Sequence, residues 1–127
     1  MNPTVKTELD KIVSTLAETG IVTKIILFGS YAKGEETPSS DIDLCVLTTV
    51  KDKRSVEVTT DLRLKLWDVQ TMPLDLFALN QDDFYAHAKR PTSFEYEIAK
   101  TGVMLYGVRG DVRRAPREWR GVWAGGG

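Results

Sequence analysis

The chain has 127 residues, of which 42% are hydrophobic and 28% charged, a composition typical of a single globular domain. The densest apolar run covers only residues 25–28, which is far too short to span a membrane. The amino-terminal segment lacks the apolar core of a signal peptide, and the single cysteine excludes an intrachain disulfide framework. We therefore expect a cytoplasmic protein with no membrane partner.

The formal net charge of −1 conceals an uneven distribution along the chain. Residues 108–127 hold five arginines against Asp111 and Glu118, whereas residues 1–107 carry an acidic excess. We predict one domain over residues 1–107, followed by a basic, flexible tail over residues 108–127. Clustered arginine suits nucleic acid or an acidic protein surface, so we expect nucleic-acid binding only through this tail, if at all.

Hydrophobic spacing predicts the secondary structure. Apolar residues recur at three- and four-residue steps from Val5 to Leu16, which predicts a helix that ends near Gly20. Apolar runs rich in β-branched residues predict strands over 21–28 and 41–49, with a helical turn after the first. The same periods predict a helix over 53–69, a strand over 73–79 and short helices in 80–88 and 93–102. Residues 103–107 are expected to form a short strand or a terminal extension. This order predicts an α/β (α+β) domain in which helices flank a small mixed sheet.

Two aspartates, Asp41 and Asp43, begin the second predicted strand. Strand alternation places both side chains on one face, about 6–7 Å apart. Carboxylates that close repel each other, and a divalent cation such as Mg²⁺ or Mn²⁺ would relieve the repulsion. A calcium-binding EF-hand loop is excluded, because that loop needs glycine at its sixth position, where this chain has Val46.

A glycine-serine pair, Gly29-Ser30, ends the first predicted strand. Glycine and serine at the start of a helical turn offer backbone N–H groups and a hydroxyl to phosphate oxygens. Gly29 and Gly34 also have the glycine spacing of a P-loop. A P-loop is rejected, however, because Glu35-Glu36 stand where its Lys-Ser/Thr pair belongs.

The segment "FGSYAKGEETPSSDIDL", residues 28–44, resembles the signature of the polymerase-β-like nucleotidyltransferase superfamily. Its form is most similar to the minimal nucleotidyltransferases, small domains that are often paired with a HEPN partner. The resemblance extends over roughly residues 5–107, although only residues 28–44 are highly specific. It implies the polymerase-β-like nucleotidyltransferase fold.

The resemblance also implies the roles of individual residues. Gly29 and Ser30 would bind the triphosphate of a nucleotide, and Lys33 stands where the family has a basic residue that contacts phosphate. Three carboxylates would form a two-ion Mg²⁺ site and carry the catalysis, with the third on a later strand in an apolar setting: Asp41, Asp43 and Asp75.

The implied function is Mg²⁺-dependent transfer of a nucleoside monophosphate, with AMP from ATP as the leading choice among nucleoside triphosphates. The implied acceptor is a protein hydroxyl, a tyrosine of a cognate HEPN ribonuclease toxin, which would make this chain the antitoxin of a type VII-like toxin–antitoxin system. Two alternatives stay open: a binding module that neutralises its partner without catalysis, and an adenylyltransferase of a small molecule such as an aminoglycoside. Oligomerisation is also left open.

Two further reactive side chains are predicted to be structural. His87 is the only histidine, so a histidine-based metal site or catalytic triad has no support, and we expect this residue on a helix surface. Cys45 lies in an apolar strand, where a packed and inert thiol is expected.

Overall fold

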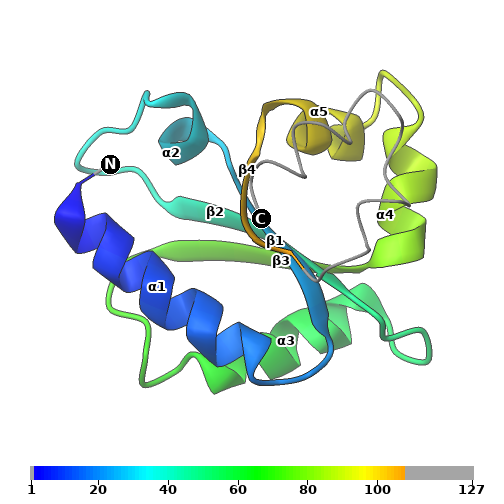
Figure 1. Cartoon of the computed structure of the whole chain (residues 1–127), viewed down its shortest axis with the longest axis horizontal. Helices are drawn as coiled ribbons and strands as arrows, with labels where there is room; N and C mark the ends of the chain where they lie inside the picture. The colour runs from blue at the N-terminus through cyan, green and yellow to red at the C-terminus, as the bar shows by residue number, and fades with distance from the viewer. Residues whose placement is uncertain (1, 108–127) are drawn as a thin grey trace.

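The computed structural model describes residues 2–107, which form a four-stranded sheet with helices on both faces (Figure 1). The predicted order of elements is confirmed, with these bounds in chain order: α1 (Pro3–Ala17), β1 (Val22–Phe28), α2 (Ser30–Lys33), β2 (Ile42–Thr48), α3 (Ser55–Lys65), β3 (Leu74–Asn80), α4 (Gln81–Ala88), α5 (Phe94–Thr101) and β4 (Val103–Gly107). The predicted basic tail lies outside the described residues, so the division of the chain at residue 107 stays a prediction.

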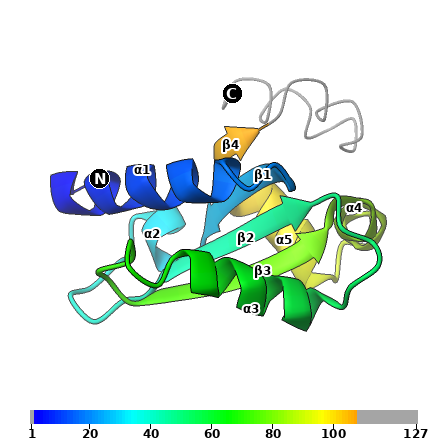
Figure 2. The same ribbon diagram turned by 90° about the horizontal axis from the view of Figure 1, so that it is seen from below.

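The sheet has the strand order β3-β2-β1-β4. β1 runs antiparallel to both of its neighbours, whereas β2 and β3 run parallel and are connected through α3. A parallel pair needs such a crossover, because the chain must return to the end of the sheet at which β2 starts before β3 can run in the same direction. Figure 2 shows α3 lying along β3 after this return. The mixed sheet predicted from the sequence is therefore confirmed.

Strand alternation divides the interior into two cores. One face of the sheet packs against α1 and α3 through buried residues such as Ile25, Leu44 and Leu76. The other face packs against α4 and α5 through Ile26 and Cys45. Figure 1 shows the two pairs of helices on opposite sides of the sheet. Within residues 2–107, none of the helices has the length and apolar character needed to cross a membrane.

One predicted boundary was wrong by several residues. The helix expected over residues 53–69 extends only from Ser55 to Lys65. The apolar spacing continued beyond its end because Leu66, which caps the helix, is fully buried although it is no longer helical. Burial of a side chain depends on the tertiary fold, so an apolar pattern in the sequence can continue beyond the last helical residue.

Glu8 of α1 anchors the turn that leads into β3. This buried carboxylate accepts hydrogen bonds from the Thr71 N–H (2.6 Å), the Thr71 hydroxyl (2.7 Å) and the Met72 N–H (3.0 Å). Burial raises the pKa of a carboxyl, but these bonds and the nearby Lys11 outweigh it, so the pKa of Glu8 lies below its ordinary value. In the same turn, the Pro73 carbonyl accepts from the N–H of Ile42 (3.0 Å), which aligns the starts of β2 and β3.

We expect Glu8→Gln to lower the free energy of unfolding by about 1–3 kcal/mol near pH 7, because it replaces a charged acceptor of several hydrogen bonds. Since the pKa is depressed in the folded state, the contribution is complete above the pKa of an unfolded glutamate. It is lost as the pH falls through the folded pKa. Urea unfolding at about pH 7 and about pH 3 measures the difference, with the exposed Glu18→Gln as control. An equal loss of stability at both pH values would contradict this account.

Candidate active site

A glycine-serine turn joins β1 to the single-turn helix α2. Gly29 has φ 75° and ψ −152°, a conformation that residues with a side chain rarely adopt. It is the N-cap of α2, and the first N–H groups of any helix have no partner within that helix. Those groups, with the Ser30 hydroxyl, suit phosphate oxygens. The nucleotide-binding role of Gly29 and Ser30 stays a prediction.

The register of the sheet places two of the predicted catalytic carboxylates side by side. Asp43 of β2 lies opposite Asp75 of β3 in the parallel pair, on strands about 4.8 Å apart. On its other side, Asp43 is paired with Phe28 of β1, the residue that precedes Gly29. Asp41 is exposed and immediately precedes β2. One end of the sheet therefore holds the glycine turn and all three aspartates.

The carboxylates influence one another electrostatically. The pKa of Asp43 is raised, first by its partial burial and then by the negative charges of Asp75 and Asp41. Both causes disfavour the charged form of this side chain. The site is therefore an arrangement of negative charge that the rest of the fold holds together, which is typical of functional sites.

Gly29 is required by the position of Asp43 as well as by its own backbone. A Cβ atom added to Gly29 would clash with the carboxylate of Asp43, with its closest approach at Oδ2. The backbone of the predicted phosphate turn thus lies directly against a predicted metal ligand. This close approach brings the predicted phosphate-binding turn into contact with one of the predicted metal-binding carboxylates.

The residues at this end of the sheet suit the predicted divalent cation by the type of donor they offer. In the part of the chain that the structure describes, no three His, Cys, Asp or Glu side chains converge as a metal-binding group. Two observations support the fit: the donors are hard carboxylate oxygens, and Gly29 leaves a cradle beside Asp43 that a Cβ would fill. The identity of the ion as Mg²⁺ and the two-ion arrangement stay predictions.

The remaining predicted nucleotide-binding residue, Lys33, belongs to α2. It lies exposed at the carboxyl end of α2, one helical turn beyond Gly29. His87 is exposed on α4, as predicted, and its Nδ1 lies 3.0 Å from a carboxylate oxygen of Glu95. Cys45 is fully buried, and burial raises the pKa of its thiol to about 12, so this sulfur is unsuited to nucleophilic chemistry.

Sequence reasoning missed the aromatic residues next to the aspartates. Phe28 pairs with Asp43 across the sheet, and Phe77 follows Asp75 by two residues on the same strand face. The signal was available for Phe77, because alternation puts residues two apart on one face. For Phe28 no signal was available, because its neighbour is set by the pairing of β1 with β2.

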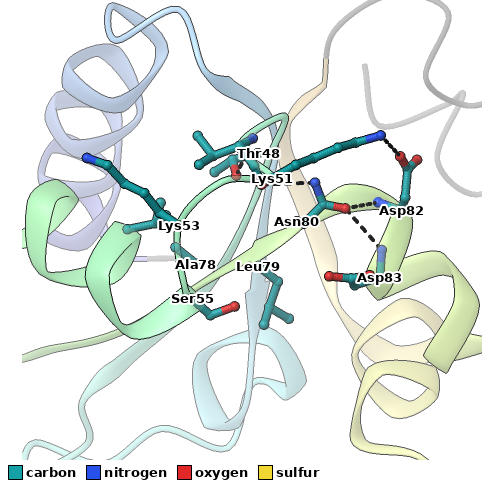
Figure 3. Close-up of a pocket in the computed structure, with 11 residues that line it drawn as sticks. Thr48, Lys51, Lys53, Ser55, Ala78, Leu79, Asn80, Asp82 and Asp83 are labelled. Carbon is teal, nitrogen blue, oxygen red and sulfur yellow. Dashed lines mark hydrogen bonds and ion pairs between the residues drawn. The ribbon is translucent and has the colours of Figure 1, made fainter.

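A pocket of about 270 Å³ lies elsewhere, at the opposite ends of β2 and β3 (Figure 3). Lys51, Asn80 and Asp82 line it, and Lys51 forms an ion pair of 3.2 Å with Asp82. The Asn80 side chain caps α4 by accepting from the N–H groups of Asp82 and Asp83, as Figure 3 shows. The Asn80 cap and the Lys51–Asp82 ion pair join α4 to the strand ends, and we do not place the active site there.

Comparison with known proteins decides the family. A family model described as "Polymerase beta, Nucleotidyltransferase" matches residues 10–109, which include the glycine turn and all three aspartates. The chain belongs to the polymerase beta nucleotidyltransferase family. The enzyme class predicted from the sequence, a nucleotidyltransferase, is thereby confirmed, as is the resemblance on which it rested.

Individual known proteins are similar to the chain over most of its length. "Putative protein adenylyltransferase MJ0604" of Methanocaldococcus jannaschii is 33% identical over 87 residues, which are 68% of this chain and 81% of that protein. A chain in the crystal structure of a toxin–antitoxin with AMP-PNP is 26% identical, with a TM-score of 0.50 over 80% of this chain and 75% of its own.

A third similarity shows the shared fold alone. It is to a chain in the structure of a tri-AMPylated HEPN toxin of Shewanella oneidensis in complex with an MNT antitoxin. The identity is 20% and the TM-score 0.51, over 94% of this chain and 87% of that one.

We expect Gly29→Ala to abolish Mg²⁺-dependent nucleotide binding and to destabilise the protein by about 1–3 kcal/mol, because the new methyl group needs both an unfavourable φ and the space of the Asp43 carboxylate. Gly20→Ala is the matched control, since Gly20 has φ 77° but no heavy atom within 4 Å of an added Cβ. The control should lose some stability and keep binding. Calorimetry with Mg²⁺ and AMP-PNP measures binding, and equal binding by the two variants would refute the proposed contact.

We expect Asp43→Asn to raise the free energy of unfolding in EDTA by about 0.5–2 kcal/mol, because it removes a partly buried charge that Asp75 and Asp41 repel. Added Mg²⁺ should stabilise the wild type and have little effect on the variant. Thermal unfolding with and without Mg²⁺ measures both effects. Equal stabilisation of the two proteins by Mg²⁺ would show that Asp43 does not bind the ion.

Proposed function

We propose that this nucleotidyltransferase transfers AMP from ATP to a protein hydroxyl, in a reaction that depends on Mg²⁺. The observation that carries the proposal is the placement of Asp43 beside Asp75 and against Gly29, at one end of the sheet. Carboxylates next to a phosphate-binding turn suit the transfer of a phosphoryl-type group, because that chemistry depends on positioning and on charge neutralisation.

Each residue has a role in this proposal. The N–H groups after Gly29 and the Ser30 hydroxyl bind the phosphates that will leave, and Lys33 approaches them from the end of α2. Asp41, Asp43 and Asp75 would hold Mg²⁺, which when bound would neutralise the charge on the phosphate oxygens. Asp75 orients the attacking hydroxyl and accepts its proton. A bond forms between the acceptor oxygen and the α-phosphorus, the bond from that phosphorus to the bridging oxygen breaks, and pyrophosphate leaves.

We further propose that the acceptor is a tyrosine of a HEPN-type ribonuclease and that AMPylation inactivates it, so that this chain acts as an antitoxin in the cytoplasm. The similar protein of Methanocaldococcus jannaschii carries the name of a protein adenylyltransferase, and a similar chain at 26% identity belongs to a toxin–antitoxin structure. The MNT antitoxin complex adds a protein of the same fold beside an AMPylated HEPN toxin. These similarities favour a protein acceptor over an aminoglycoside.

The test is transfer of label from α-³²P-ATP, with Mg²⁺, to a HEPN-type protein, and the reading frames next to the gene for this chain are the place to search for it. We expect labelling of that protein, and loss of label when its acceptor tyrosine is changed to phenylalanine. Asp75→Asn and the double variant Asp41→Asn/Asp43→Asn should each reduce transfer at least about 100-fold, because each removes a group that acts in the transition state. Asp68→Asn, an exposed aspartate after α3, is the matched control and should transfer normally.

Two results would contradict the proposal. Transfer by the double aspartate variant at the wild-type rate would exclude these carboxylates as the catalytic groups. Absence of transfer by the wild type, together with rescue from the toxin by both wild type and double variant, would instead identify a non-catalytic antitoxin that acts by complex formation.

A further inference from the structure

Three phenylalanines from three different elements form a cluster beside the aspartates. The rings of Phe28 (β1), Phe77 (β3) and Phe94 (α5) lie with their centroids 5.6–6.2 Å apart, and Phe94 meets both of the others edge to face. We call these three residues the phenylalanine cluster. Phe77 is 46% exposed and Phe94 is 55% exposed, so solvent reaches a large part of two of the three rings.

The cluster adjoins the carboxylates on the same face of the sheet. Phe28 is the cross-strand partner of Asp43, and Phe77 follows Asp75 by two residues, a spacing of about 7 Å along a strand. On β2, Cys45 follows Asp43 by two residues on the same face. Cys45 pairs with Phe77 of β3 and is fully buried. Phe28 and Phe77 therefore lie between the core of this face and the solvent next to the active site.

Packing against the core explains the buried side of the Phe28 and Phe77 rings, but it does not explain why aromatic surface is exposed to solvent. A core is closed by the inner surface of a side chain, and a leucine at either position would do so without exposing an aromatic ring. A group of exposed aromatic rings next to a proposed substrate site is better explained by a ligand that covers them. A phenylalanine side chain has no polar group, so the cluster would recognise a ligand through ring surface and not through hydrogen bonds.

The proposed substrate has one part that matches such a surface. With phosphates at Gly29 and Ser30, the nucleoside would extend past the aspartates, and the phenylalanine cluster adjoins those aspartates on the same face of the sheet. Any nucleobase can stack on an aromatic side chain, because every base has a π-face. Phe28 is covalently joined to Gly29, which links the cluster to the phosphate end of the ligand.

We propose that the phenylalanine cluster is the nucleobase subsite of this enzyme, in which Phe77 and Phe94 stack on the base of the nucleoside triphosphate. The inference rests on the proposed function, since it assumes that a nucleotide binds at Gly29 and the aspartates. The subsite would also determine which nucleobases the enzyme prefers. A site that uses ring surface binds purines more tightly than pyrimidines because their rings are larger, and it distinguishes adenine from guanine only weakly.

The test compares two ligands that differ only in the nucleoside. Calorimetry measures the binding of AMP-PNP and of inorganic tripolyphosphate, each with Mg²⁺, to the wild type and to Phe77→Ala and Phe94→Ala. We expect each variant to bind AMP-PNP about 5- to 100-fold more weakly, the range for loss of one base–aromatic stack, and to bind tripolyphosphate as the wild type does. Trp67→Ala is the matched control: Trp67 is an exposed aromatic residue after α3, and its loss should change neither affinity.

A second measurement reports stacking directly. The H2 and H8 protons of adenine should shift upfield in the NMR spectrum on binding to the wild type, because they enter the ring current of an aromatic side chain, and the shift should be smaller with Phe94→Ala. Both variants replace exposed residues, and thermal unfolding shows whether each one is folded.

The outcomes separate this proposal from the one on which it rests. If the wild type binds AMP-PNP through Asp43 but both phenylalanine variants bind it equally well, the nucleobase subsite is wrong and the proposed function stands. If the variants keep AMP-PNP affinity but lose transfer to the protein acceptor, the cluster receives the acceptor instead, and the proposal is also overturned. If the wild type binds neither ligand, both proposals fail.

Discussion

The parallel register between β2 and β3 is the constraint on which the candidate site depends. It sets Asp43 opposite Asp75 on neighbouring strands, where the two carboxylates repel each other. The partial burial of Asp43, and after it the negative charge of Asp75, raise the pKa of Asp43. Two such groups would separate in a flexible chain. They stay together because the alternate residues of the same strands, including Leu44 and Leu76, are buried against α1 and α3 on the opposite face. The hydrophobic core of one face therefore holds the charges of the other in place.

Hydrogen bonds to α1 and to β2 fix the start of β3, which carries Asp75. Glu8 accepts three hydrogen bonds from Thr71 and Met72 immediately before the strand, and the Pro73 carbonyl binds the N–H of Ile42. A shift of this segment by one residue would move Asp75 to the other face of the sheet. The contact between Gly29 and the Asp43 carboxylate completes the arrangement from the side of β1. The site is thus positioned by several elements, of which α2 is the shortest.

The sequence predicted the fold and its family well, for reasons that can be traced to particular residues. Alternation in 41–49 correctly separated Ile42 and Leu44 from Asp43 and Cys45, because the strand period is local. The end of α3 was less predictable, because Leu66 is buried beyond the last helical residue. Glu8 was not identified at all, since its partners lie more than sixty residues away and nothing local indicates them.

By itself, the sequence determined which residues are chemically suited to the site: a glycine-serine turn, two aspartates one residue apart, and a third aspartate within an apolar strand. Spacing and residue type are properties of a short segment, so they can be read without the fold. Only the tertiary structure decided that Asp43 meets Asp75, that Gly29 lies against the Asp43 carboxylate, and that Phe28, Phe77 and Phe94 gather beside them. Those contacts follow from strand pairing and from the packing of α5, which join residues that are distant in the chain.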